Sequence, residues 1–231
     1  MGMNEPTRSP SQITTASAAC LVAAPLIAVV GRLQATPWLE DPAEYLAEIS
    51  RHPGRSDLGA QLILLSALLF IPAAIALAGL VGVRRRRLAL FGGVLAVAGA
   101  VGLAATAVAS LIAGQMSRVD NRGAMVELED RILTEPPMQM FPLLLAAGAV
   151  GSVALAVGLY RSRAVPRPAA VLVGLGGATT MLTAAGPVRA AVVTAAVLAL
   201  AGFAWVAATT RPDPAGRFSQ PTVGTPLNVT S

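Results

Sequence analysis

The sequence predicts an all-α fold, a polytopic transmembrane helix bundle of six spans with two short helical extracytoplasmic loops. Charged residues make up 13% of the chain and hydrophobic residues 55%, whereas a soluble domain carries about 25% charged residues. Long apolar runs alternate with short charged segments. Aromatic residues are only 4%, and the small Ala, Gly and Val residues that dominate suit close packing between membrane helices.

Six apolar runs approach the roughly 20 residues that a helix needs to cross the hydrocarbon core. The predicted spans are about 14–34, 59–83, 88–114, 139–160, 169–186 and 189–209. The fifth run is short and rich in Gly and Thr, so a five-span topology with 169–209 partly re-entrant stays open. The flanking segments 1–13 and 210–231 are rich in polar residues and Pro, and we expect disordered cytoplasmic ends there.

The arginines predict the orientation, because basic residues in short loops stay on the cytoplasmic side of a membrane. All 17 basic residues are arginine, a composition typical of GC-rich bacterial genes. The predicted cytoplasmic loops hold Arg84, Arg85, Arg86, Arg87, Arg161, Arg163 and Arg167. Every acid except Glu5 and Asp213 falls in the two outer loops, 35–58 and 115–138. The sequence therefore predicts a multi-pass protein of the bacterial inner (plasma) membrane with both termini cytoplasmic.

A removable targeting segment is the alternative for the first 34 residues. Arg32 and Leu33 stand where a signal-peptide cleavage site needs small residues. In a lipoprotein box the apolar run precedes the cysteine, whereas here it follows Cys20. We therefore interpret this segment as a first membrane span.

Each outer loop contains a helical pattern. In "DPAEYLAEIS" (41–50), Asp41 is a candidate N-cap and Pro42 a first helical residue. The apolar face there consists of Tyr45, Leu46 and Ile49. In "GAMVELEDRILTEPP" (123–137) the predicted apolar stripe is Met125, Leu128 and Ile132, with an ion pair between Glu127 and Arg131. These helices either lie on the outer membrane surface or pack on each other as a lid.

No ionisable residue occupies the centre of a predicted span. Arg32 and Arg189 stand at span ends, where we expect them to extend to the interface. This pattern argues against a proton pump, an acidic cation channel or a haem protein. One cysteine and one histidine provide no Cys/His metal site, and no base–nucleophile pair is evident. We predict no catalytic residue, cofactor or metal, and interpret the outer carboxylates as a solvated face rather than a divalent-cation site.

Some polar and small residues within the spans suggest packing, and a few suggest a cavity. Hydroxyl groups in membrane helices usually bond their own backbone or a neighbouring helix. The candidate cavity lining is Thr179, Thr180 and Thr183 in the fifth run, with a helix kink at Pro72. The small-residue faces that include Gly92 and Gly151 predict tight helix contacts, within the chain by preference, while a homo-oligomer stays open.

The runs "DPAEYLAEISRHPGRSDLGAQLILLSALLFIPAAIALAGLVGVR" and "AVGLYRSRAVPRPAAVLVGLG" resemble small bacterial, actinobacterial-type integral membrane proteins of unknown function. The resemblance implies the multi-span topology. It implies no catalytic or ligand residue.

These observations favour a non-enzymatic accessory or sensory component of the membrane. Its expected partners are the lipid bilayer and a protein that contacts the outer loops, with no role for nucleic acid because the basic residues lie in short runs between spans. The alternative is a facilitator or exporter of an apolar or amphipathic small molecule. A membrane enzyme that uses the outer carboxylates ranks third.

Overall fold

The computed structural model is all-helical and describes residues 15–39, 41–82, 85–135, 138, 140–184 and 188–210. The predictions for 1–13 and 211–231 lie outside the described residues, as does Arg84. The helices are α1 (Thr15–Gln34), α2 (Pro42–Arg51), α3 (Pro53–Val81), α4 (Arg86–Met116), α5 (Arg122–Thr134), α6 (Met140–Ser162), α7 (Arg167–Leu182) and α8 (Arg189–Thr209).

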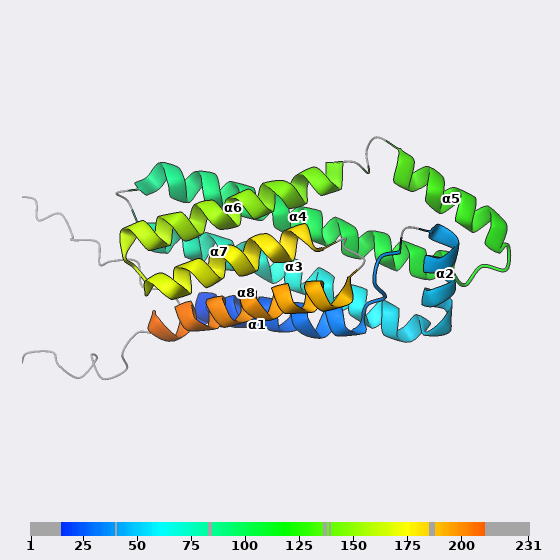
Figure 1. The fold of residues 1–231 in the computed structure, drawn as a ribbon, viewed down its shortest axis with the longest axis horizontal. Coiled ribbons are helices and arrows are strands. Elements are labelled where there is room, and N and C mark those ends of the chain that lie inside the picture. Colours follow the sequence, from blue (N-terminus) through cyan, green and yellow to red (C-terminus); the bar gives the residue numbers. More distant parts are fainter. Residues whose placement is uncertain are drawn as a thin grey trace, which may run out of the picture.

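Six of the helices form one bundle, and the two short ones cap it (Figure 1). Contacts between neighbours close a ring in the order α1, α3, α4, α6, α7, α8, with α3 also touching α6 across the middle. The start of α1 and the end of α8 lie at the same end of the bundle (Figure 1). The main apolar core draws on all six helices and fills the centre of the ring.

Five helices are long and apolar enough to cross a membrane: α1 from Ala16, α3, α4, α6 and α8 from Ala190. The sixth bundle helix, α7, has 16 residues and so spans about 24 Å, against about 30 Å for a hydrocarbon core. The structure therefore supports a helical bundle with five candidate spans, and it does not confirm the predicted total of six. Helix α7 is the short, Gly- and Thr-rich run that left a five-span topology open.

Helices α4 and α6 approach each other closely. A Cβ built on Gly99 would lie 2.4 Å from the Cα of Gly148, and one on Gly151 would lie 2.4 Å from the backbone nitrogen of Ala96. Gly92 likewise faces Leu155 of α6. The predicted contacts at Gly92, Ala96 and Gly151 are therefore confirmed as contacts within the chain.

Helices α3 and α4 are the longest, with 29 and 31 residues, or about 44 and 46 Å. Both extend beyond the apolar runs that predicted them, because polar residues continue each helix past its apolar part. Helix α3 begins at Pro53, a favourable first helical residue. The two helices project past the rest of the bundle, and the projecting ends carry α2 and α5 (Figure 1).

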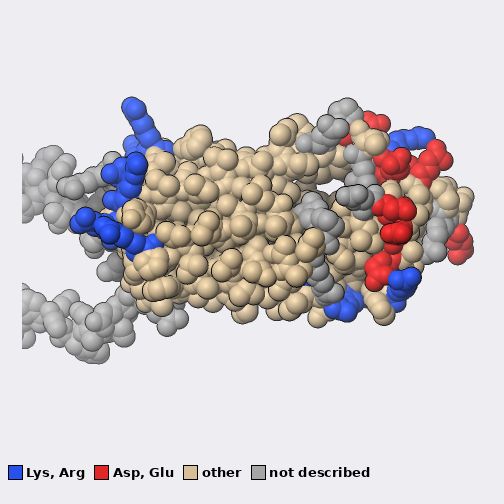
Figure 2. Space-filling model, viewed as in Figure 1, with Lys and Arg blue, Asp and Glu red and all other residues tan. Residues whose placement is uncertain are grey.

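The described acids gather at one end of the bundle, whereas arginines lie at both ends (Figure 2). One end holds Arg85, Arg86, Arg87, Arg161, Arg163 and Arg167, which flank the junctions of α3 with α4 and of α6 with α7. The guanidinium of Arg167 lies over the ring of Tyr160 at 5.5 Å. The described acids lie at the other end, on α2, α5 and the start of α3, and we call this the acidic end.

Candidate ligand-binding cavity at the acidic end

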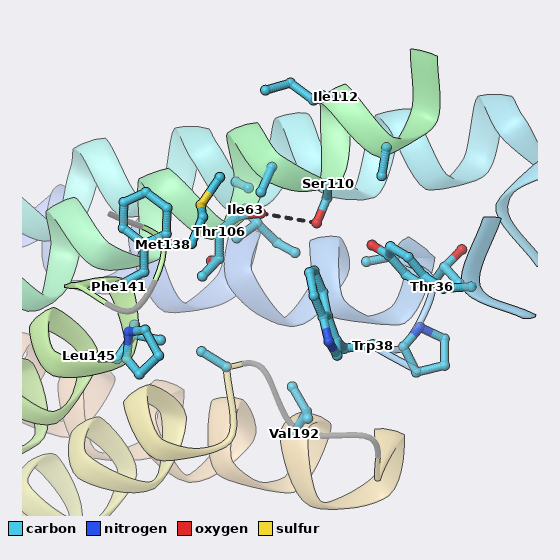
Figure 3. Close-up of a pocket in the computed structure, with 18 of the residues that line it drawn as sticks. Thr36, Trp38, Ile63, Thr106, Ser110, Ile112, Met138, Phe141, Leu145 and Val192 are labelled. Carbon is cyan, nitrogen blue, oxygen red and sulfur yellow. Dashed lines mark hydrogen bonds between the residues drawn. The ribbon is translucent and has the colours of Figure 1, made fainter. Parts of the chain in front are cut away.

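A cavity of about 520 Å³ lies between the bundle and the cap formed by α2 and α5. Because α7 stops at Leu182, no side chain from a further turn of that helix fills the space beside α3 and α4. Figure 3 places Trp38 and Thr36 across the cavity from Phe141 and Leu145. In Figure 2 the surface is hollowed between the cap and the bundle.

The cap is held by its own small apolar cluster. Tyr45, Leu46 and Ile49 of α2 are buried against Ala113 and Met116 of α4. The N-cap at Asp41 is confirmed, since its carboxylate accepts from the backbone N–H of Ala43 at 2.8 Å. Because the apolar face of α2 packs on α4, the membrane-surface interpretation does not hold for α2. Met125 and Val126 of α5 pack against the same cluster, so the two helices meet as the lid interpretation expects.

Helix α5 turns Met125 and Ile132 of the predicted stripe inward, with Glu129 rather than Leu128 between them. Met125 packs on the cap cluster, while Glu129 and Ile132 line the cavity. Leu128, placed in the predicted stripe, is 42% exposed. Residues 125, 129 and 132 follow the i, i+4, i+7 spacing of one helix face. Because Glu129 is charged, the apolar pattern of the sequence did not include it in that face. The predicted ion pair of Glu127 with Arg131 is confirmed at 3.1 Å.

Glu129 is the buried acid of the cavity. It is 5% exposed, and its Oε2 has no hydrogen-bond partner among the described residues. Burial disfavours the charged carboxylate and raises the pKa of Glu129 to about 7. The interpretation of the outer carboxylates as a solvated face is therefore wrong for this residue.

An aromatic pair lines the same cavity. The rings of Trp38 and Tyr45 lie 5.0 Å apart between centroids. Burial raises the pKa of the Tyr45 hydroxyl; a hydrogen bond with Ser110 acts against that shift, and the nearby charge of Glu129 adds to it. The cap and the segment before α2 therefore present two adjacent aromatic rings and a carboxyl group to the cavity.

Arg32, at the end of α1, lines the cavity from the bundle side. Its Nη1 donates to the carbonyl of Ala184 at 2.8 Å, just beyond the end of α7. Its Nη2 is buried and has no partner among the described residues. The expectation that Arg32 extends outward to the interface is wrong, because the guanidinium instead donates to the carbonyl of Ala184, beyond the end of the short α7.

The predicted cavity residues lie elsewhere. Thr179 and Thr183 donate to the carbonyls of Leu175 and Thr179, at 2.6 and 2.7 Å, and Pro72 lies inside α3. Thr180 is buried, its Oγ1 has no partner among the described residues, and it lines a separate void of about 20 Å³ inside the bundle. None of these four residues is among those that line the large cavity.

Most other hydroxyls serve helix packing, as predicted. Ser66 of α3 donates to the carbonyl of Ala24 in α1 at 2.8 Å. Thr106 and Ser110 line the large cavity, and each bonds a carbonyl of its own helix, at 2.8 and 3.0 Å.

In the described part of the chain, no three His, Cys, Asp or Glu residues lie together so that they could hold a metal ion. The cavity has apolar walls, three aromatic rings, a guanidinium and a carboxyl group. Such an arrangement recognises a ligand by its shape and by a few polar groups.

The comparison with protein families gives one match. The model of the domain of unknown function DUF4386 matches residues 16–210, from α1 to the end of α8. No curated protein and no solved structure matches the chain. The resemblance to a family of unknown function is confirmed at that level, and its actinobacterial type stays a prediction. Since the match covers most of the sequence, the chain belongs to the DUF4386 family.

Proposed function

We propose that this chain is a sensory or accessory component of the bacterial inner membrane that binds an amphipathic small molecule at its acidic end. The observation that carries the proposal is the cavity of about 520 Å³ under the cap. Its volume falls in the range of small-molecule sites, which are largely apolar with a few polar groups. Binding there would change the contact between the cap and the bundle, which a sensory role requires.

The binding proposal can be tested with N-phenyl-1-naphthylamine, a neutral dye that fluoresces in apolar sites. We expect protein-dependent fluorescence in nanodiscs, and loss of it when Ala109→Phe fills the cavity that Ala109 lines. Ala201→Phe is the matched control, because Ala201 is exposed on α8 and does not line the cavity. Equal dye fluorescence in the two variants would contradict the proposal.

The proposed topology has six passes, with the arginine end in the cytoplasm and the acidic end outside. The retention of arginine-rich loops on the cytoplasmic side supports this orientation. The common end shared by the start of α1 and the end of α8 supports an even number of passes. In a Cys20→Ser background, Asn121→Cys at the acidic end should react with an impermeant maleimide added to intact cells. Arg163→Cys should react only after lysis, and the reverse pattern would invert the orientation.

Facilitated movement of the ligand is the second candidate, and Met181 favours it. Met181 lines both the large cavity and the small inner void, so one flexible side chain borders both spaces. The void of about 20 Å³ holds about one water molecule, so passage would require the bundle to open. Protein-dependent efflux of the dye from reconstituted vesicles would establish this role in place of simple binding.

The accessory role also needs a protein that contacts the outer loops 35–58 and 115–138. Support comes from their fold, since α2 and α5 form an ordered cap with its own apolar cluster. Removing α5 should abolish co-purification of that protein while the bundle stays intact. Unchanged co-purification would remove the support for an accessory role.

A further inference from the structure

We infer that the ligand of the cavity is a zwitterionic amphiphile, whose anionic group binds Arg32 and whose cationic group binds Glu129 beside Trp38 and Tyr45. This inference rests on the proposed function and names its ligand class. Its basis is that two groups of opposite charge type, both with a buried atom lacking a partner among the described residues, line one largely apolar cavity.

The anionic group of the ligand is assigned to Arg32 because only one of the two Nη atoms of its guanidinium has a hydrogen-bond partner among the described residues. Nη1 bonds the carbonyl of Ala184, which fixes the position of the group, and Nη2 is left without a partner in the described part of the chain. A buried donor without a partner costs free energy, and a phosphate or carboxylate of the ligand would satisfy it with a charge-assisted bond.

The cationic group is assigned to the cap side of the cavity. Glu129 presents a buried carboxyl group, and Trp38 and Tyr45 present adjacent rings. Aromatic rings bind alkylammonium groups through their negative faces, most strongly where water is excluded. A cation placed there would also favour the ionised carboxylate, so the three side chains act on the same charge.

The rest of the ligand is apolar, because the remaining walls are. Phe141 and Leu145 of α6 and Ile63 of α3 line the cavity. Ile112 and Leu182 also line it, and both are exposed, so its rim continues onto the apolar outside of the bundle. An alkyl chain could therefore extend from the cavity into the bilayer.

A ligand with a single charge would serve only one of the two groups. A purely cationic amphiphile leaves Arg32 without a counter-charge, and a purely anionic one places its charge in a cavity that also holds Glu129. Unpaired charges in a space of low dielectric are costly, whereas complementary ones determine specificity.

The test uses probes with one octyl chain and different head groups. In a Trp205→Phe background Trp38 is the remaining tryptophan, so its emission reports on the cavity directly. The probes are octylphosphocholine, octyltrimethylammonium, octyl phosphate and the uncharged octyl glucoside, titrated against protein in nanodiscs of phosphatidylglycerol. We expect octylphosphocholine to bind at least about tenfold more tightly than octyl glucoside.

Variants assign the two ends of the ligand. Glu129→Gln should weaken octylphosphocholine and octyltrimethylammonium but not octyl phosphate, and Glu127→Gln, on the exposed side of the same helix, should weaken none. Arg32→Gln should weaken octylphosphocholine and octyl phosphate. Arg32→Lys keeps the charge and covers the case in which Arg32→Gln does not fold.

The outcomes separate this inference from the proposed function. Equal affinity for octylphosphocholine and octyl glucoside, or tightest binding of a singly charged probe, overturns the inference and leaves the cavity as a binding site. If no probe changes Trp38 emission and the naphthylamine dye does not bind, both fail. If the natural ligand is a membrane lipid, phosphatidylethanolamine in the nanodiscs should compete with octylphosphocholine. Absence of that competition would indicate a soluble amphiphile.

Discussion

Small residues have opposite effects in two regions: they let helices meet in the middle of the bundle and leave open space at its acidic end. In the middle, Gly99 of α4 lies against Gly148 of α6. About two turns further along α4, Ala107 and Ala109 line the cavity. Small side chains let two backbones meet where a second helix is present. Where a helix across the ring ends, as α7 does at Leu182, they leave space. Helix length, rather than composition, decides which result follows.

The largest expected effect is at the close contact. Gly99→Leu should destabilise the fold by roughly 3 kcal/mol or more, because a Cβ there meets the backbone of Gly148 at 2.4 Å and neither helix can move away alone. Thermal unfolding in detergent measures this loss. Gly79→Leu is the control, since a Cβ at Gly79 meets nothing within 4 Å. Equal losses in the two variants would show that helix length alone keeps the bundle together.

The acidic end should show a pH dependence that the middle lacks. The pKa of Glu129 is raised by burial to about 7 from an ordinary value of 4.5. The folded chain therefore holds a proton that the unfolded chain has released, so stability falls as pH rises between these two values and levels off above the higher. The full effect is at most about 3 kcal/mol.

Glu129→Gln should remove that dependence, and melting temperatures at about pH 5 and about pH 8 would measure it. The other ionisable groups that line the cavity are Tyr45 and Arg32, neither of which titrates in that interval in its ordinary state. Glu127→Gln, on the exposed side of α5, should leave the dependence unchanged. A slope that survives Glu129→Gln would assign it to another group.

The contrast between the two regions also explains what could be predicted from the sequence. The bundle helices were predictable because their apolar runs are long. The start of α2, with Asp41 as N-cap and Pro42 as the first helical residue, was predictable because that pattern is local. The cavity was not, since it depends on how far α7 and α3 extend relative to each other. Glu129 shows the difficulty most clearly: on α5 it resembles any other outer acid, and only the i, i+4, i+7 relation to Met125 and Ile132 indicates the inward face.

Arg32 was misjudged for a related reason. Its place at the end of an apolar run predicts a side chain that extends to the interface. The carbonyl that it binds, that of Ala184, is 152 positions away in the sequence. No local pattern contains that information, whereas the confinement of nearly all acids to two segments of the chain did predict the acidic end seen in Figure 2.

The smallest effects should come from the ion pairs of the acidic end, and their order is informative. Arg118 pairs with Asp57 and so joins the end of α4 to the start of α3. Arg51 pairs with Glu48 within α2, at 2.6 Å, and is 70% exposed. Arg118→Gln should cost about 1 kcal/mol, because Oδ1 of Asp57 is already buried without a partner among the described residues.

Arg51→Gln should change the unfolding midpoint by less than Arg118→Gln, since water replaces the lost contact at an exposed pair. The two projecting helix ends lie beyond the rest of the bundle, so the Asp57 pair replaces the packing that α6 supplies to α3 and α4 further down. If Arg118→Gln also weakens dye binding while Arg51→Gln does not, the ion pair maintains the width of the cavity. If neither variant changes dye binding, the apolar cluster around Tyr45 and Met116 is sufficient to hold the cavity open.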